Sequence, residues 1–238
     1  MIDMHKRILL RSVSLILCLF CIISIAKPQI SAQKPQNGSG YRSIQTDGMQ
    51  IALTFDDGPH PTQTPKILEI LERYKVKATF FMIGVNVVNY PHVARAVLRG
   101  GHEVGNHTYS HYHIKELGSS ALETELGKCE DALEELCEYR PHLLRPPEGM
   151  VTQDVKTYSE KGDYALILWS LDTRDWEHRS ATEIADSVLS QVKPGDIILM
   201  HDYVGRESNT PHALEILLPE LLSRGYEPVT VSQLLKIR

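Results

Sequence analysis

The 238-residue sequence predicts an α/β fold of about seven strand-helix units around a parallel sheet, either closed into a distorted barrel or open and doubly wound. Short apolar runs alternate with amphipathic stretches of ten to twenty residues from Met49 onward. The runs lack alternating polar residues, which is typical of strands covered on both faces. A chain of this length supports one sizeable core, so we expect a single domain over residues 49–238.

The elements follow one another in a regular order. The stretches between the strands carry apolar residues at spacings of three and four, as helices do. The clearest helices are predicted within Thr64–Tyr74 and Glu116–Tyr139. The predicted strands are Ile51–Phe55, Ala78–Ile83, His102–Val104, His142–Leu144, Tyr164–Leu168, Ile197–Met200 and Pro228–Val231.

Residues 1–26 are predicted to be an export signal. Three basic residues, Lys6, Arg7 and Arg11, precede an apolar run, Val13–Ala26. Fourteen residues rise about 21 Å as a helix, short of the roughly 30 Å hydrocarbon core. Cleavage after the run is therefore favoured over an uncleaved membrane anchor. In either case the domain is expected outside the cytoplasm, secreted or attached at the outer face of the membrane.

Residues 27–48 are predicted to be a polar tether, because they contain proline and glycine and have no apolar period. Two cysteines, Cys129 and Cys137, follow this segment and fall in one predicted helix. Eight helical residues separate two Cα atoms by roughly 12 Å, against about 6 Å in a disulfide. Both thiols are therefore expected to be free and to face the core.

The charge of the chain limits its partners. A formal net charge of -5 provides no basic surface for nucleic acid. No glycine-rich phosphate motif follows any predicted strand, so a nucleotide cofactor is not expected. We expect a monomer that acts on a neutral partner.

Titratable side chains follow five predicted strands directly. Parallel sheets place their functional groups at the carboxyl ends of the strands, so these groups should converge on one rim. They are Asp56 and Asp57, His107, Arg145, Asp172, and His201 with Asp202.

A metal site is predicted from the first two of these groups. Asp57, His107 and His111 form a set of two imidazoles and one carboxylate, which leaves coordination positions open for water and substrate. The histidines lie four residues apart, a spacing that brings both to one ion from a helix or from a loop. Taken alone, an Asp-Asp-Gly-Pro sequence is also ordinary turn chemistry, and one such histidine pair also arises by chance.

The other groups have ordinary explanations when each is taken singly. Arg145 could form a surface ion pair, Asp172 and Asp175 could be solvated loop charges, and His201-Asp202 could cap the next helix. Their common position at strand ends favours a shared site. The remaining candidates, His60, His102 and His113, are expected to be structural or solvent-facing.

Five ordered motifs together resemble those of the polysaccharide deacetylases, the NodB-homology or carbohydrate esterase family 4 proteins. The resemblance spans Met49 to the end of the chain and implies the same distorted barrel. The motifs are Thr54-Phe55-Asp56-Asp57-Gly58-Pro59, His107-Thr108-Tyr109-Ser110-His111, Arg145-Pro146-Pro147-Glu148-Gly149, Asp172-Thr173-Arg174-Asp175-Trp176 and Leu199-Met200-His201.

The resemblance implies a role for each matching residue. Asp57, His107 and His111 would hold a divalent metal, usually Zn²⁺, although Co²⁺, Mn²⁺ or Ni²⁺ would also serve. Asp56 would be the general base with Arg145 as its tether. His201 would be the general acid, held by Asp172. Pro147, Glu148, Trp176 and Leu199 would line the substrate site, and Glu148 departs from the aromatic residue or glycine of many members.

The implied reaction is removal of N-acetyl groups from an amino-sugar polymer, with release of acetate. Peptidoglycan N-acetylglucosamine is expected first, then chitin-type oligomers, then acetylated xylan. A glycosidase is disfavoured because adjacent Asp56 and Asp57 do not straddle a bond at roughly 5 to 9 Å. A serine esterase would need a G-x-S-x-G elbow, which the sequence lacks. A non-catalytic carbohydrate-binding protein is the remaining alternative.

Overall fold

The computed structural model describes residues 38–205 and 208–237, in which eight strands form one sheet with parallel pairing throughout. Their order is β5-β4-β3-β2-β1-β7-β6, and β8 pairs with the start of β1. The predicted parallel α/β fold is confirmed. The strands are β1 (Gln50–Asp56), β2 (Thr79–Met82), β3 (Glu103–Asn106), β4 (Leu143–Leu144), β5 (Ala165–Leu166), β6 (Leu171–Asp172), β7 (Ile197–His201) and β8 (Glu227–Val229).

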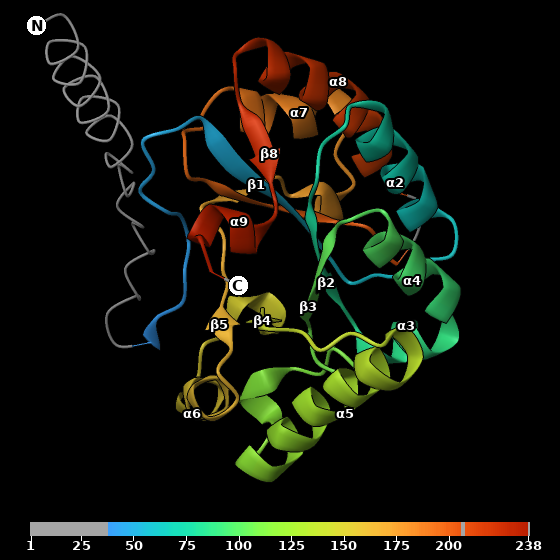
Figure 1. Cartoon of the computed structure of the whole chain (residues 1–238), viewed down its shortest axis with the longest axis vertical. Helices are drawn as coiled ribbons and strands as arrows, with labels where there is room; N and C mark the ends of the chain where they lie inside the picture. Colours follow the sequence, from blue (N-terminus) through green and yellow to red (C-terminus); the bar gives the residue numbers. More distant parts are fainter. Residues whose placement is uncertain (1–37, 206–207, 238) are drawn as a thin grey trace, which may run out of the picture. The chain divides into compact units, whose positions relative to one another are not determined.

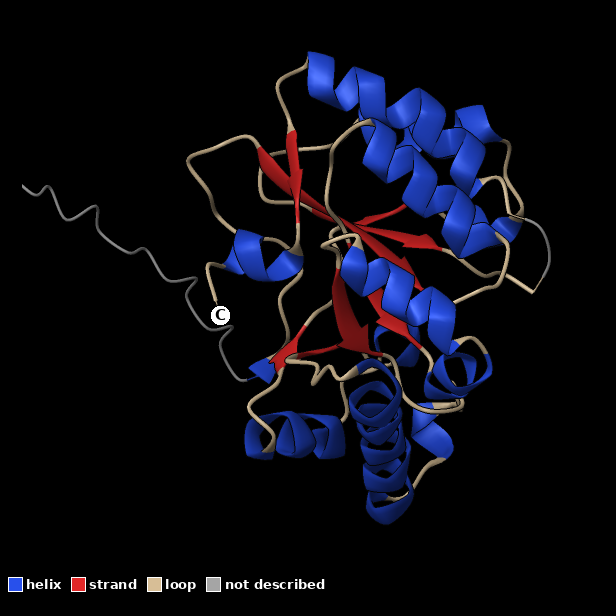
Figure 2. Ribbon diagram, turned by 45° about the vertical axis from the view of Figure 1, so that its right-hand side comes forward, coloured by secondary structure: helices blue, strands red, loops and turns tan. Residues whose placement is uncertain are grey.

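The sheet has to curl because of how its two ends are connected. β5 and β6 stand at opposite ends of the strand order, yet only residues 167–170 separate them in the chain. In a flat sheet, strands spaced about 4.8 Å apart would put these ends about 29 Å from each other. So short a connection spans at most about 18 Å. The sheet therefore bends into the open barrel seen among the helices in Figure 2.

Helices follow one another around the outside of this sheet (Figure 1). α7 packs on α8, α8 on α2, α2 on α4, and α5 contacts α3, α4 and α6. The helices are α2 (Gln63–Arg73), α3 (Gly84–Asn89), α4 (Pro91–Arg99), α5 (Ser119–Cys137), α6 (Gln153–Lys161), α7 (Ala181–Leu189), α8 (Thr210–Ser223) and α9 (Val231–Leu235), with short 3₁₀ turns at Ile114–Glu116, Pro147–Gly149 and Asp175–Glu177.

Strand β1 shows why the apolar runs lack a polar face. Ile51, Leu53 and Phe55 belong to one core cluster, which also contains side chains of α2 and α8. Ala52, which points to the other face, belongs to a second cluster with Val231 of α9. Both faces of β1 are buried, so a continuous apolar run is what this position requires.

Two expectations about the elements need correction. The predicted strand Tyr164–Leu168 is only Ala165–Leu166, because the chain then crosses to the other end of the sheet and forms β6. The predicted tether is also shorter than expected. Tyr41 pairs with Ile167 and Ser43 with Asp196, so the last part of residues 27–48 is bound to the folded domain.

The expected export signal and residues 27–37 lie outside the described residues, as do Cys18 and Cys21. In the part that the structure describes, Cys129 is buried and Cys137 half-buried, and both are free thiols in or against the main core, as predicted. No helix among the described residues has the length and apolar character needed to cross a bilayer.

Candidate active site

The predicted site residues lie at the carboxyl ends of neighbouring strands. Asp56 ends β1 and is in register with His201, which ends β7. His107 follows β3, and Arg145 follows β4. Because these four strands lie in one parallel sheet, the rim expected from the sequence is formed.

Asp57, His107 and His111 offer ligand atoms that lie within 4.8 Å of one another. Oδ1 of Asp57 is 3.4 Å from Nε2 of His107 and 3.3 Å from Nε2 of His111. This buried oxygen has no hydrogen-bond partner among the described residues. An unpaired buried carboxylate oxygen facing two imidazoles fits a divalent cation, and the mixed oxygen and nitrogen donors suit Zn²⁺ and similar ions.

The charges of this cluster act on one another. Burial raises the pKa of Asp57, but His107, with smaller contributions from His201 and His111, outweighs this and holds the pKa below its usual value. Burial lowers the pKa of His107, yet Asp56 and Asp57 raise it overall. For His111, burial and the neighbouring His107 lower the pKa.

The two histidines come from a loop, so the loop alternative to a helix is the one observed. Thr108 and His111 adopt positive φ angles of 67° and 57°. Oδ1 of Asn106 accepts the Thr108 N–H at 2.9 Å, and Oγ1 of Thr108 accepts the His111 N–H at 3.2 Å. Nδ1 of His107 lies 2.6 Å from the carbonyl oxygen of Arg145. This contact requires a proton on Nδ1, which leaves Nε2 free to bind a cation.

Asp56 is held by a completely buried arginine. Nη1 of Arg145 donates to Oδ1 of Asp56 at 2.7 Å and to Oγ1 of Thr54 at 2.8 Å. Nη2 donates to the carbonyl of Leu168, and the guanidinium lies 4.1 Å from the centroid of the Phe81 ring. A buried charge of this kind persists only with such partners. The expected pairing of Arg145 with Asp56 is present.

The partner of His201 is Asp175, not Asp172 as expected from the resemblance. Oδ1 of Asp175 lies 2.7 Å from Nδ1 of His201, and Oδ2 accepts the His201 N–H at 2.8 Å. Asp172 instead accepts the backbone N–H of Arg174 at 2.8 Å. β6 ends at Asp172, and the following 3₁₀ turn brings Asp175 back toward β7. This reversal follows a strand of two residues, which no sequence period reveals.

The carboxylate of Asp175 sets the charge of His201. Burial lowers the pKa of the imidazole, but the hydrogen bond and charge of Asp175 raise it to about 9. Oδ2 of Asp175 also accepts the hydroxyl of Thr210 at 2.6 Å. Sequence reasoning missed Thr210, which lies at the start of α8 and belongs to no recognised motif.

The expected substrate-site residues differ in exposure. Pro147 and Leu199 are buried, and Trp176 is 47% exposed. Oε1 of Glu148 lies 2.8 Å from Nδ1 of His113, in an ion pair between the loops that carry Arg145 and His111. Their role in binding a substrate stays a prediction.

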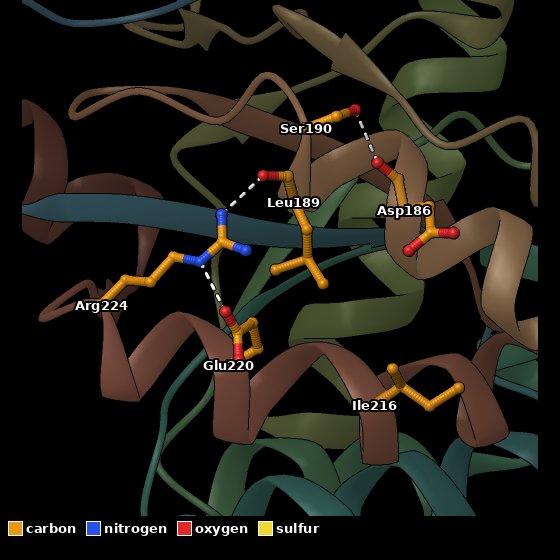
Figure 3. Close-up of a pocket in the computed structure, with 6 residues that line it drawn as sticks. All are labelled: Asp186, Leu189, Ser190, Ile216, Glu220 and Arg224. Atoms are coloured by element: carbon orange, nitrogen blue, oxygen red, sulfur yellow. Dashed lines mark hydrogen bonds and ion pairs between the residues drawn. The ribbon is translucent and has the colours of Figure 1, made fainter.

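One pocket lies away from this rim, between α7 and α8 (Figure 3). Its arginine, Arg224, already pairs with Glu220 at 2.8 Å and donates to the carbonyl of Leu189 at 2.6 Å. None of the predicted site residues lines it. The lining residues are Asp186, Leu189, Ser190, Ile216, Glu220 and Arg224.

Comparison with known proteins gives a consistent set of relatives. The polysaccharide deacetylase family model matches residues 43–167. A peptidoglycan-N-acetylglucosamine deacetylase of Bacillus cereus is 41% identical over 79% of this chain and 89% of its own length. A chitooligosaccharide deacetylase of Bradyrhizobium is 38% identical over 82% of this chain and 92% of its own.

A solved structure shows the same architecture. It is the crystal structure of a peptidoglycan N-acetylglucosamine deacetylase in complex with an N-hydroxybenzamide compound. Its TM-score is 0.80 and its identity 33%, over 83% of this chain and 92% of that one.

Proposed function

Because this chain belongs to the polysaccharide deacetylase family, we propose that it hydrolyses N-acetyl groups of an amino-sugar polymer and releases acetate. The observation that carries the proposal is the cluster of Asp57, His107 and His111, with Asp56 and His201 in register beside it. This set contains metal ligands, a base and an acid, which are the groups that amide hydrolysis requires.

The three ligand residues would hold a divalent cation, for which Zn²⁺ is our first choice. When bound, such a cation would polarise the acetyl carbonyl and would supply a water that ionises near neutral pH. The preference for Zn²⁺ over Co²⁺, Mn²⁺ and Ni²⁺ rests on the family resemblance, because one carboxylate and two imidazoles can bind any of these ions.

Asp56 and His201 would move the protons. The carboxylate of Asp56, fixed by Arg145, accepts the proton of the attacking water. His201 then donates a proton to the departing amine nitrogen, since Asp175 keeps its imidazole charged at neutral pH. Without that proton, the amine would have to leave as an anion.

Peptidoglycan N-acetylglucosamine is the proposed substrate. The names of the Bacillus cereus relative and of the solved structure support it. The predicted export signal supports it as well, because it would bring the domain to the cell wall. A chitin-type oligomer is the second candidate, supported by the Bradyrhizobium relative.

The test is acetate release from peptidoglycan, N-acetylglucosamine oligomers and acetylated xylan by purified protein with and without added metal. We expect release from peptidoglycan and from N-acetylglucosamine oligomers, loss in excess chelator, and recovery with a divalent ion. Shortened sugar chains without acetate would indicate a glycosidase. Release that persists after prolonged chelation would exclude the metal mechanism.

A further inference from the structure

Asp202 and Gly58 make an unusually close approach behind the candidate metal site. A Cβ atom placed on Gly58 would lie 2.1 Å from Oδ2 of Asp202 and 2.5 Å from its Cγ. Both distances are far inside van der Waals contact. Gly58 has no positive φ, so the carboxyl group of Asp202, not the backbone angle, requires glycine here.

The side chain of Asp202 is fixed in this position. It is 1% exposed, and its Oδ2 accepts the hydroxyl of Thr64 at 2.5 Å. The Thr64 hydroxyl oxygen in turn accepts the N–H of His60 at 2.8 Å. The backbone N–H of Asp202 donates to the carbonyl of Asp56 at 3.1 Å. Asp202 thus contacts the segment 56–60 directly at Gly58 and Asp56, and indirectly through Thr64.

This segment needs external support because it includes a strained residue. Asp57 has a φ of 74°, a left-handed conformation that residues other than glycine adopt only at a cost in free energy. On one side, Asn86 donates to the carbonyl of Asp57 at 2.8 Å, and the Ile83 N–H donates to the carbonyl of Gly58 at 2.9 Å. Asp202 supports the segment from the β7 side, one residue after His201.

A capping role does not explain Asp202. Helix α8 begins at Thr210 and its N-cap residue is Asn209, so Asp202 lies outside its first turn. Oδ1 of Asp202 has no hydrogen-bond partner among the described residues. A buried carboxyl group with one unpaired oxygen lowers stability, so its presence calls for another role.

We propose that Asp202 is a positioning residue whose carboxyl group packs against Gly58 and thereby holds Asp57 in its metal-binding conformation. The inference rests on the proposed metal role of Asp57. It predicts that the side-chain volumes at positions 58 and 202 are coupled. A methyl group added at position 58 should be tolerated only when the carboxyl group at position 202 is removed.

The test measures the dissociation constant for Zn²⁺ by competition with a chromophoric chelator, and it needs no substrate. Gly58→Ala should weaken binding at least about tenfold, the usual effect of disturbing the support of a metal ligand. Asp202→Ala should weaken it to a similar degree. In the double variant, removal of the carboxyl group leaves space for the new methyl group. The loss of Zn²⁺ affinity should therefore be clearly smaller than the product of the two single losses.

Two matched variants separate this role from general destabilisation. Asp196 lies directly before β7 as Asp202 lies directly after it, and it is also buried, with Ser170 and Lys193 as partners. Asp196→Ala should lower the melting temperature and leave the Zn²⁺ dissociation constant unchanged. Asp202→Asn keeps the volume of the side chain, so it should give Gly58→Ala no relief.

The inference is overturned if Asp202→Ala binds Zn²⁺ as tightly as the wild type, if the single losses multiply in the double variant, or if Asp202→Asn relieves Gly58→Ala as well as Asp202→Ala does. If Asp202→Ala does not fold, Gly58→Ala decides, because unchanged Zn²⁺ binding in that variant overturns the inference. Coupled metal binding in a protein that releases no acetate would sustain this inference while removing the proposed function.

Discussion

At the scale of single residues, the adjacent aspartates Asp56 and Asp57 face different partners because the backbone turns between them. Asp56 is the last residue of β1 and points to the buried Arg145. Asp57 has left the strand with a positive φ and faces two imidazoles. The sequence motif predicted this division, whereas the contacts that Asn86 and Ile83 make with this segment come from other elements and form no sequence pattern.

Replacing Asp56 with asparagine should separate catalysis from metal binding. The amide cannot accept a proton, so acetate release should fall by about 10²- to 10⁴-fold. Zn²⁺ should stay bound, since Asp57, His107 and His111 are intact. Metal content and acetate release are measured on the same sample. His107→Ala, as the comparison, should lose both. A near wild-type rate in Asp56→Asn would remove this residue as the base.

Replacing Asp175 with asparagine should change the pH profile. In its proposed role as the acid, His201 must be protonated, and its pKa of about 9 keeps it so through neutral pH. Loss of the neighbouring charge lowers this pKa, so the alkaline limb of kcat/KM should move to lower pH by about one unit or more. Asp172→Asn is the control and should leave the limb in place. A shift of the alkaline limb in Asp172→Asn alone would identify Asp172, not Asp175, as the residue that holds His201.

At the scale of elements, the longer strands could be predicted from the sequence and the shorter ones could not. β1 and β7 are buried on both faces and are visible as apolar runs. β5 and β6 have two residues each and are defined by partners distant in the chain. The position of Asp175 depends on this region. The expectation that Asp172 holds His201 is wrong for this reason.

The packing of α8 can be tested with adjacent residues. Leu217 is completely buried in the main core, whereas Ile216 is 40% exposed beside the pocket of Figure 3. Leu217→Ala should lower the free energy of unfolding by about 2–5 kcal/mol because it leaves a cavity. Ile216→Ala should change it much less. Urea denaturation monitored by circular dichroism compares the two, and equal losses would contradict the assigned face of α8.

At the scale of the whole molecule, metal binding should be coupled to folding. A cation that binds only the native protein raises the free energy of unfolding by about 2.7 kcal/mol at one hundred times its dissociation constant. The melting temperature should therefore rise with added Zn²⁺ and fall in chelator. His111→Ala should abolish the increment. His113→Ala should retain it, because His113 pairs with Glu148 outside the cluster.

For the whole molecule, features that recur along the chain could be predicted from the sequence, and features without such a pattern could not. Fold class and strand-end position could be predicted because burial and polarity recur along the chain. The involvement of Tyr41 and Ile44 could not, since two apolar residues in a polar segment form no period. Volume constraints such as that between Gly58 and Asp202 join distant positions and leave no local pattern.

The bridge made by Tyr41 has a consequence for self-association. An unclosed sheet exposes rows of N–H and C=O groups onto which a second chain can add. Here the outer strand β5 is two residues long, and Tyr41 donates to the carbonyl of Leu166 and accepts the N–H of Leu168. The opposite outer strand, β6, is equally short. These two outer strands therefore offer little template for edge-to-edge polymerisation.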